Sequence, residues 1–307
     1  MKSPFLTILI PTFNRAALLT QALDSAFIDD LSDRSMFEVI VIDDGSTDDT
    51  SERLAARVQA GDIEYLRMPE NRGTAAARNA GIDAARGTWI AYLDSDNRLL
   101  PGALELLIAE LRAVPESVGI FWGNCRDRDG NTTTTHGGVG IVPGMHLVEG
   151  RYAGEHFSVV RTALARRHKY AELGSRNECA ACFWYPIALA SDLYLSPSIF
   201  QYYETEGVDR LTSKESRRYR SFELVRCFEE TLSRFGPVLE ERAPKTFWGL
   251  HGRIAFYRAI AGEWLPSVRA GVRGAQGWRD VPSNLGVLGI CLAGPWAARL
   301  ALTRRPL

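Results

Sequence analysis

Residues 88–96 read Thr-Trp-Ile-Ala-Tyr-Leu-Asp-Ser-Asp, and this stretch decides which fold the chain can adopt. Trp89–Leu93 is an unbroken apolar and aromatic run, which is typical of a strand that is buried on both faces. Two carboxylates, Asp94 and Asp96, follow it directly. A strand of this kind needs helices on both sides, so the stretch indicates a parallel sheet in an α/β domain.

The residues that precede this stretch repeat an alternation of strand and helix. We predict strands over 5–10, 37–42, 63–68 and 88–93, with helices between them and another helix from Pro101. Short apolar runs closed by turn residues favour a parallel sheet that is covered on both faces. In such sheets the ligand binds outside the carboxyl ends of the strands.

Polar residues follow three of the predicted strands at their carboxyl ends. Because parallel strands end at the same edge of a sheet, we expect these side chains to converge on one ligand. They are Thr12 and Asn14 after the first strand, Asp43 and Asp44 after the second, and Asp94, Ser95 and Asp96 after the fourth.

Asp94 and Asp96 have the chemistry of a partial metal site. Mg²⁺ and Mn²⁺ prefer hard oxygen donors and take their remaining ligands from phosphates and water. A cation held there neutralises charge on a departing diphosphate. The alternative interpretation is a cap for the helix at Pro101, but the alignment with the other strand ends favours the metal site.

The loops after the second and third strands each have two interpretations. Asp43 and Asp44 stand before Gly45 and either form a turn or accept hydrogen bonds from a base or a ribose. Arg72 and Arg78 flank a run of small residues and suit a phosphate or nucleobase wall. Arg78 alternatively pairs with an acidic neighbour in the sheet.

Four motifs of the first hundred residues occur together in one known family. In this order and spacing they resemble the family 2 glycosyltransferases of the GT-A fold, over about residues 5–105. The likeness thins over 105–215 and is nearly absent after that. The motifs are Ile10–Arg15, Val41–Asp48, Asn71–Gly81 and Leu93–Asp96.

The resemblance implies an inverting transfer of a sugar from a UDP-, GDP- or dTDP-sugar donor, with Mn²⁺ or Mg²⁺ as cofactor. It also implies a mostly parallel central sheet flanked by helices. From the sequence itself we expect a helical C-terminal extension after this domain. Asp96 is then the metal ligand, and Asp94 lies near both ribose and metal. The implied donor-binding residues are Pro11, Thr12, Asn14, Asp43, Asp44, Gly73, Arg78, Asp94 and Ser95.

An inverting transfer needs a base that deprotonates the acceptor hydroxyl. Members of the family often carry Glu-Asp at the start of a helix in the acceptor half, with the Asp as base. Here the corresponding residues are Asn177 and Glu178, so Glu178 is the candidate base, although it is one methylene longer. The alternative is a helix-start glutamate favoured by the helix dipole.

Many relatives also carry a histidine after the aromatic strand as a further metal or phosphate ligand. This chain has no histidine there, because the stretch reads Tyr202-Tyr203-Glu204-Thr205-Glu206. Either Glu206 supplies an oxygen to the metal instead, or that ligand is missing.

Charge is distributed unevenly along the chain. From residue 210 onward there are 17 Lys and Arg against 8 Asp and Glu, whereas the whole chain has a net charge of -1. The acidic front part argues against a nucleic-acid partner. The basic ending suits an anionic membrane, and the apolar run within 285–305 is expected either to lie on that surface or to pack on the domain.

The same C-terminal run is broken by glycines, Pro295 and Arg299, so a membrane-spanning helix is not expected. Residues 1–5 do not read as a signal peptide, which places the protein in the cytoplasm, with the inner face of the cell membrane as a peripheral location. A glycan or a lipid-linked acceptor is consistent with that location.

The five cysteines predict no disulfide framework, because their number is odd and no second pair matches the Cys179/Cys182 spacing. We interpret Cys179 and Cys182 as small residues that pack a helix. A zinc site is excluded without a partner chain.

We expect three regions: a nucleotide-sugar-binding half over 1–98, an acceptor-binding half over 99–213, and a helical region over 214–307. Two other classes remain as alternatives. One is a metal-dependent phosphotransferase, which usually has its D-x-D after the first strand rather than the fourth. The other is a degenerate GT-A protein that binds sugar nucleotides or acts as a scaffold.

Overall fold

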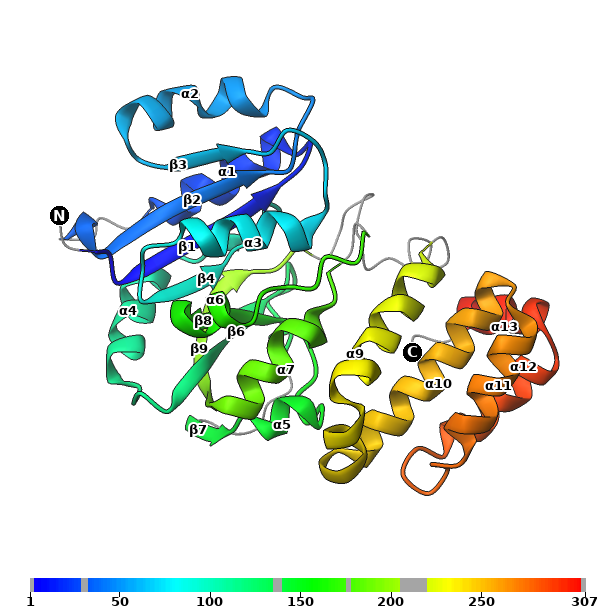
Figure 1. The fold of residues 1–307 in the computed structure, drawn as a ribbon. Helices are drawn as coiled ribbons and strands as arrows, with labels where there is room; N and C mark the ends of the chain where they lie inside the picture. The colour runs from blue at the N-terminus through cyan, green and yellow to red at the C-terminus, as the bar shows by residue number, and fades with distance from the viewer. Residues whose placement is uncertain (1–2, 29–32, 135–139, 175–177, 205–219, 305–307) are drawn as a thin grey trace. The chain divides into compact units, whose positions relative to one another are not determined.

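The structure is a computed structural model that describes residues 3–28, 33–134, 140–174, 178–204 and 220–304. Two compact units make up the chain. The first contains Met1–Arg176 and Phe183–Glu206, and the second contains Asn177–Cys182 and Gly207–Leu307. Figure 1 shows a central sheet with helices in the first unit and helices alone in the second.

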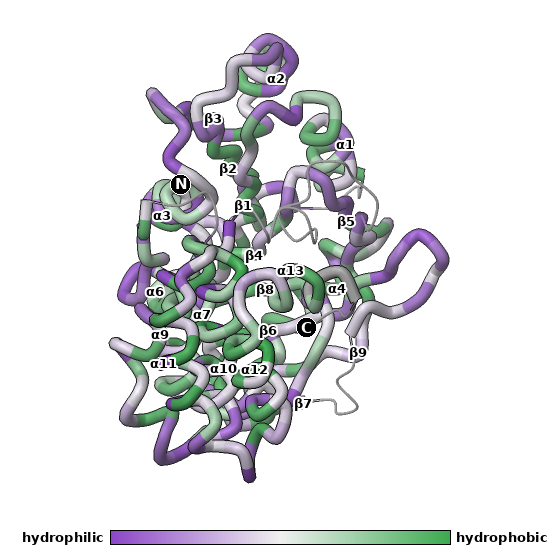
Figure 2. Tube along the Cα trace, turned by 90° about the vertical axis from the view of Figure 1, so that its right-hand side faces the viewer, coloured by the Kyte–Doolittle hydropathy of each residue, from purple (hydrophilic) through white to green (hydrophobic). Residues whose placement is uncertain are grey.

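The amino-terminal half of the first unit is the predicted β/α alternation. Its four strands are all parallel and lie in the order β3-β2-β1-β4. β1 and β2 are mostly hydrophobic, whereas the edge strand β3 is largely hydrophilic (Figure 2). In chain order the elements are β1 (Leu6–Thr12), α1 (Ala16–Ala26), β2 (Phe37–Asp43), α2 (Thr50–Ala60), β3 (Glu64–Arg67), α3 (Thr74–Ala84) and β4 (Trp89–Tyr92).

Helices cover both faces of this parallel sheet because successive residues of each strand point to opposite sides. Ile8 and Ile10 of β1 belong to the same core cluster as Leu19 and Leu23 of α1. Leu9, on the other face, packs so closely under α3 that a Cβ at Gly81 would lie 2.1 Å from its side chain. The expected α/β architecture is therefore confirmed for this half.

The second half of the sheet is mixed rather than parallel. β6 pairs antiparallel with β8 and parallel with β9, and β5 and β7 both pair antiparallel with β9. β4 also pairs antiparallel with β8, so the described part of the sheet contains as many antiparallel as parallel pairings, which corrects the expectation of a mostly parallel sheet. The elements are β5 (Arg98–Leu99), α4 (Ala103–Ala113), β6 (Val118–Arg126), β7 (Gly140–Pro143), α5 (Met145–Val148), β8 (His156–Arg161), α6 (Thr162–Arg167), α7 (Ala180–Ala190) and β9 (Asp192–Tyr202).

The second unit consists of helices, as expected for the C-terminal region. Its core gathers Ile254, Phe256 and Ile260 of α10 with Cys291 of α12 and Ala298 of α13. The apolar tail is therefore packed on this unit through one face. The helices are α9 (Ser221–Arg242), α10 (Pro244–Ala261), α11 (Trp264–Ala275), α12 (Ser283–Leu292) and α13 (Pro295–Arg304).

No helix within the described residues has the length and apolar character that crossing a membrane requires. The chain turns at Gly294, which has a φ of 91° and separates α12 from α13. The predicted interruption of the apolar run is therefore confirmed.

The cysteine prediction was wrong in one respect. Cys179 and Cys227 form a disulfide, with Cα atoms 5.2 Å apart and a sequence separation of 48. The Cys182 thiol is buried and lies 3.2 Å from the Cys179 sulfur. Spacing along the chain could not reveal this pair, because α9 brings Cys227 to the residues that precede α7.

Gly45, in the turn after β2, requires glycine for two reasons. Its φ is +77°, and a Cβ there would lie 2.7 Å from the backbone carbonyl carbon of Glu70. Gly61, the C-cap of α2, has nearly the same φ of +74° but nothing within 4 Å of a Cβ.

We expect Gly61→Ala to lower the free energy of unfolding by about 1 kcal/mol, the cost of a left-handed alanine. Gly45→Ala should cost at least about 2 kcal/mol more, because the backbone of Glu70 must move as well. Thermal unfolding of the two variants checks this expectation. Equal losses in the two variants would contradict the close approach at Gly45.

Candidate functional site

The loops after β1 and β2 are tied together by side chains from both. The Asn14 backbone N–H donates to the Ser46 hydroxyl at 2.9 Å, and the Asn14 side-chain oxygen accepts from the Thr47 N–H at 2.7 Å. Asn14 has a φ of 51°, a conformation that asparagine tolerates better than most residues. The Asp44 N–H also donates to the Thr12 carbonyl at 2.9 Å. The first two predicted strand ends therefore converge.

Asp43 is buried and bonded inside this edge of the sheet. Its carboxylate accepts the Ser46 backbone N–H at 2.7 Å and the Tyr65 hydroxyl from β3. Burial and then the bond to Asp43 raise the pKa of Tyr65, so its hydroxyl stays protonated and donates. Asp43 thus holds the turn after β2 against the neighbouring strand.

Asp44 organises the loop that leads into α3. One carboxylate oxygen accepts the Arg72 N–H at 2.8 Å, and the other accepts the Gly73 N–H at 2.7 Å. Gly73 precedes α3 with a φ of 90°, which favours glycine. Burial raises the pKa of Asp44, although the two N–H donors oppose the shift. The Asp44 carboxylate therefore fixes the backbone next to the expected nucleotide site.

The D-x-D turn after β4 carries two ion pairs. Asp94 pairs with Arg78 at 2.8 Å, and Asp96 pairs with Arg15 at 2.7 Å. Burial raises the pKa of Asp96, the charge of Asp94 adds to the rise, and Arg15 opposes it. The two acidic groups are thus each balanced by a guanidinium, Asp96 by that of Arg15 at the start of α1 and Asp94 by that of Arg78 within α3.

These acids do not cap the following helix. β5 comes between Asp96 and α4, and the N-cap of α4 is Gly102, with no side-chain capping bond. The helix-cap interpretation of the D-x-D was therefore wrong. Arg78 does pair with an acidic neighbour, as its alternative interpretation proposed, and that neighbour belongs to the D-x-D itself.

A cluster of aromatic side chains packs against the guanidinium of Arg78. Its guanidinium carbon lies 5.1 Å from the ring centre of Tyr92 and 5.6 Å from that of Tyr170. Tyr170 stacks on Phe183 with ring centres 3.9 Å apart, and Tyr92 meets Tyr170, Phe183 and Trp184 edge to face. With only 11% of its side chain exposed, Arg78 is held in one orientation toward Asp94.

A segment around residue 170 closes one side of the site. The Asn79 side chain donates to the Tyr170 carbonyl at 3.0 Å and accepts the Tyr170 N–H at 2.9 Å. Arg72 pairs with Glu172 at 2.7 Å. Sequence reasoning missed Tyr92, Tyr170 and Glu172; the only local signal was the tyrosine inside the quoted strand.

The remaining predicted residues lie at or near the same edge. Pro11 is within β1, and Ser95 is buried in the D-x-D turn. The Thr12 hydroxyl is buried and has no hydrogen-bond partner among the residues that the structure describes. The Asn97 side-chain oxygen accepts the Glu204 N–H at 3.1 Å, which brings the end of β9 to the D-x-D turn.

Of the predicted metal ligand Glu206 and the predicted base Glu178, only Glu178 is among the described residues. Glu206 lies outside them, as does Asn177, the residue before Glu178. Glu178 directly precedes Cys179 of the disulfide, is partly buried and belongs to the second unit.

The donor set at the D-x-D fits a divalent cation only in part. Within the described ranges, no three or more His, Cys, Asp or Glu side chains gather into a group that could hold a metal ion. A cation at the D-x-D turn would therefore have two carboxylates, Asp94 and Asp96, and would take its other ligands from oxygens outside this set. This is the arrangement that Mg²⁺ and Mn²⁺ use when they bind through substrate phosphates.

A comparison with protein families gives one match that covers more than half of the chain. The model described as glycosyl transferase family 2 matches residues 7–174. This range contains all four motifs and the segment around Tyr170.

Curated relatives match over different lengths. The GalNAc(5)-diNAcBac-PP-undecaprenol beta-1,3-glucosyltransferase of Campylobacter jejuni subsp. jejuni is 30% identical over 242 residues, which are 75% of this chain and 75% of that protein. The succinoglycan biosynthesis protein ExoO of Rhizobium meliloti is 35% identical over 119 residues, 39% of this chain and 33% of that protein.

Solved structures share the fold at low identity. S. aureus TarS 1-349 in complex with UDP-GlcNAc superposes with a TM-score of 0.60 at 17% identity, covering 91% of each chain. The mannosyltransferase PcManGT from Pyrobaculum calidifontis, in complex with GDP-Man and Mn²⁺, gives a TM-score of 0.56 at 20% identity, covering 99% of this chain and 88% of that one.

Proposed function

Because the chain belongs to glycosyl transferase family 2 and is a glycosyltransferase, we propose that it moves a sugar from a nucleotide-diphosphate donor to a glycan or lipid-linked acceptor with inversion. The observation that carries this proposal is the meeting of three strand ends at one edge of the sheet. Thr12, Asp44 and the D-x-D acids all stand there.

The donor binds at this edge through its nucleotide. The Thr12 hydroxyl is buried with hydrogen-bonding capacity to spare, so it bonds to the base or ribose. Asp44 accepts from the same part of the donor through its remaining lone pairs. Arg78 faces the donor beside Asp94, with Pro11, Asn14, Asp43, Gly73 and Ser95 shaping the surrounding backbone.

Asp96 holds Mn²⁺ or Mg²⁺, with Asp94 shared between metal and ribose. When bound, such a cation supplies charge that stabilises the departing nucleoside diphosphate. A cation there would have to share or replace the guanidinium of Arg15 that Asp96 binds at 2.7 Å. Glu206 is proposed as a further ligand from the chain beyond β9.

Glu178 deprotonates the acceptor hydroxyl in this scheme. Its carboxylate takes the proton as the acceptor oxygen attacks the anomeric carbon. Support comes from its place just before α7, next to a cysteine whose disulfide ties that segment to α9.

A lipid-linked acceptor is proposed by analogy with the Campylobacter relative, whose name contains an undecaprenol diphosphate. The chain would then work at the inner face of the cell membrane, in contact with it through 285–305. Exposed apolar residues of α12 and α13 support this contact: Leu285 is 51%, Leu292 58% and Trp296 75% exposed.

Thermal-shift titration with UDP-, GDP- and dTDP-sugars in the presence of Mn²⁺ tests the donor site. We expect one nucleotide class to stabilise the protein, followed by sugar transfer when an acceptor glycan is added. A degenerate protein would bind the donor and transfer nothing.

Arg78→Lys should weaken binding of that nucleotide by roughly tenfold or more, because lysine keeps the charge but loses the planar stack on Tyr92 and Tyr170. Arg53→Lys is the matched control, since Arg53 pairs with Asp49 on exposed α2. Equal affinity in the Arg78 variant and the wild type would show that Arg78 does not contact the donor.

A further inference from the structure

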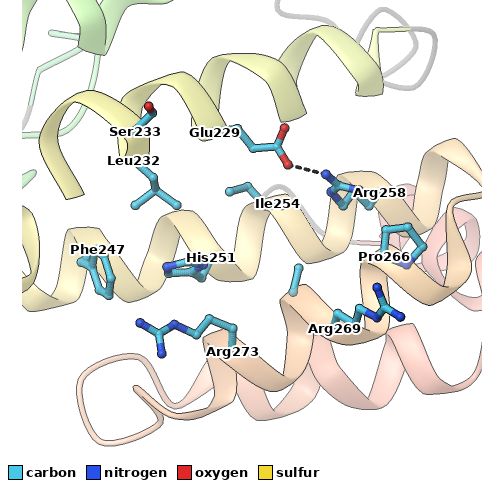
Figure 3. A pocket seen from close by; sticks show the side chains of 11 residues that line it. Glu229, Leu232, Ser233, Phe247, His251, Ile254, Arg258, Pro266, Arg269 and Arg273 are labelled. Atoms are coloured by element: carbon cyan, nitrogen blue, oxygen red, sulfur yellow. Dashed lines mark hydrogen bonds and ion pairs between the residues drawn. The ribbon is translucent and has the colours of Figure 1, made fainter. Parts of the chain in front are cut away.

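The second unit contains a pocket that the proposed transfer reaction does not use. It is an open, shallow pocket lined by α9, α10 and α11, with a volume of about 750 Å³. Figure 3 shows the arginines of α11, Arg269 and Arg273, along one side, and His251 and Arg258 of α10 along another. No residue of the D-x-D site lines it.

The lining carries excess positive charge. Its one acid, Glu229, is bonded to Arg258, which also pairs with Glu263 at 3.0 Å. Arg269 has no ion-pair partner within the described part of the chain, and Arg273 is bonded only to the neutral Gln276 there, at 3.0 Å. Neither arginine of α11 thus has a carboxylate partner among the described residues; both are exposed, and the Arg273 guanidinium lies 5.5 Å from the ring centre of Trp248.

Neutral groups complete the chemistry of the pocket. His251 packs edge-on against Phe247, with ring centres 4.8 Å apart. Burial and then the charge of Arg273 lower the pKa of His251, so its ring is neutral near pH 7 and offers one N–H donor. Leu232 and Ile254 add apolar surface between these polar groups. A ligand that suits this lining combines an anionic group with an apolar part.

α11, the helix that carries the two arginines, buries small residues and exposes both cationic and apolar side chains. Its buried side consists of small residues, and Gly274 comes so close to α10 that a Cβ there would lie 3.2 Å from the Gly252 nitrogen. Its exposed side carries Leu265 and Val272, 61% and 52% exposed, at positions i and i+7. Arg269 lies between them at i+4, so cationic and apolar side chains share one face.

An aromatic residue marks the start of the same helix. Trp264 is 48% exposed, and its indole N–H donates to the Cys291 carbonyl at 3.0 Å. A fixed, half-exposed tryptophan beside arginines and aliphatic residues is the composition that binds the interface of an anionic bilayer. A soluble phosphate ester or a nucleic acid would gain nothing from the exposed leucine and valine.

We propose that the pocket between α9, α10 and α11 binds the phosphate group of an anionic phospholipid. Arg269 and Arg273, whose guanidinium groups point apart along α11 (Figure 3), each bond to phosphate oxygens of lipid headgroups, while Leu265 and Val272 enter the headgroup region. This site is separate from the membrane contact proposed for 285–305, because its lining contains no residue of α12 or α13. It is also independent of the sugar-transfer reaction.

Co-sedimentation of the full chain with vesicles tests the proposal without any sugar donor. One set of vesicles is phosphatidylcholine alone, and the other is an equimolar mixture with phosphatidylglycerol. We expect binding to the mixed vesicles and about thirty-fold weaker binding for Arg269→Gln/Arg273→Gln, from the usual contribution of two basic residues at an anionic surface. The matched control, Arg242→Gln/Lys245→Gln, removes two exposed charges outside the pocket and should lower binding less than about threefold.

Three outcomes would overturn the proposal. Equal losses in the two double variants would mean that general surface charge, not the pocket, attracts the membrane. Unchanged vesicle binding in Arg269→Gln/Arg273→Gln would assign the membrane contact elsewhere. If inorganic pyrophosphate or a short RNA binds through Arg269 and Arg273 while vesicles do not, the ligand is not a lipid. None of these measurements depends on activity, so failure here is distinguishable from failure of the proposed transfer.

Discussion

Replacing Asp96 by asparagine is expected to lower the rate of sugar transfer about a thousand-fold. The change keeps the shape of the side chain and removes the charge that a divalent cation needs. Asp94 would then be the only acid of the D-x-D turn. The measurement is the release of nucleoside diphosphate with a saturating acceptor, together with Mn²⁺ affinity from calorimetry, which should fall in parallel.

Asp49→Asn is the matched control for this experiment. Asp49 also pairs with an arginine, Arg53, at 2.7 Å, but on the exposed surface of α2. A partly exposed ion pair contributes little to stability, so both variants should unfold within a few degrees of the wild type. If Asp96→Asn transfers sugar at the wild-type rate, the carboxylate is not a metal ligand and its pairing with Arg15 is structural.

Glu178→Gln should lower the turnover number by about a hundred- to ten-thousand-fold and leave donor affinity unchanged. Glutamine fills the same space but cannot take the proton of the acceptor hydroxyl. Initial rates at varied donor concentration, together with donor binding measured without acceptor, separate the two effects. A fall in turnover with an unaltered donor dissociation constant is the signature of a lost base.

Two further variants sharpen this test. Glu178→Asp keeps a carboxylate one methylene shorter and should retain part of the activity. Glu241→Gln on the exposed end of α9 should behave as wild type. Retained transfer in Glu178→Gln would remove Glu178 from the mechanism and leave the proposed donor site intact.

The convergence at the sheet edge was predictable because its signals are local. Buried strands read as apolar runs, and turn residues mark where each run ends. Parallel strands then place Thr12, Asp44 and the D-x-D acids at one edge whatever the details of the loops. The second half of the sheet was harder, since β9 pairs with β5, β6 and β7, and no periodicity in the sequence specifies such distant partners.

The supporting contacts of the site were not predictable in the same way. Arg78 depends on Tyr170, and Tyr170 depends on Asn79, which is 91 residues away. The disulfide between Cys179 and Cys227 shows the same limit over 48 residues. In the sequence, none of these residues differs from a residue without a special role. Only the folded structure shows which side chain each of them contacts.

By itself, the sequence determined the β/α alternation of the first hundred residues, the family, and the place of Asp94 and Asp96 after a buried strand. The tertiary structure decided that Asp94 and Asp96 face Arg78 and Arg15 rather than a helix end, and that α11 presents arginines to a pocket. The physical reason is range. Burial periodicity and turn chemistry act over a few residues, whereas ion pairs, ring stacks and pockets join segments that meet only once the chain has folded.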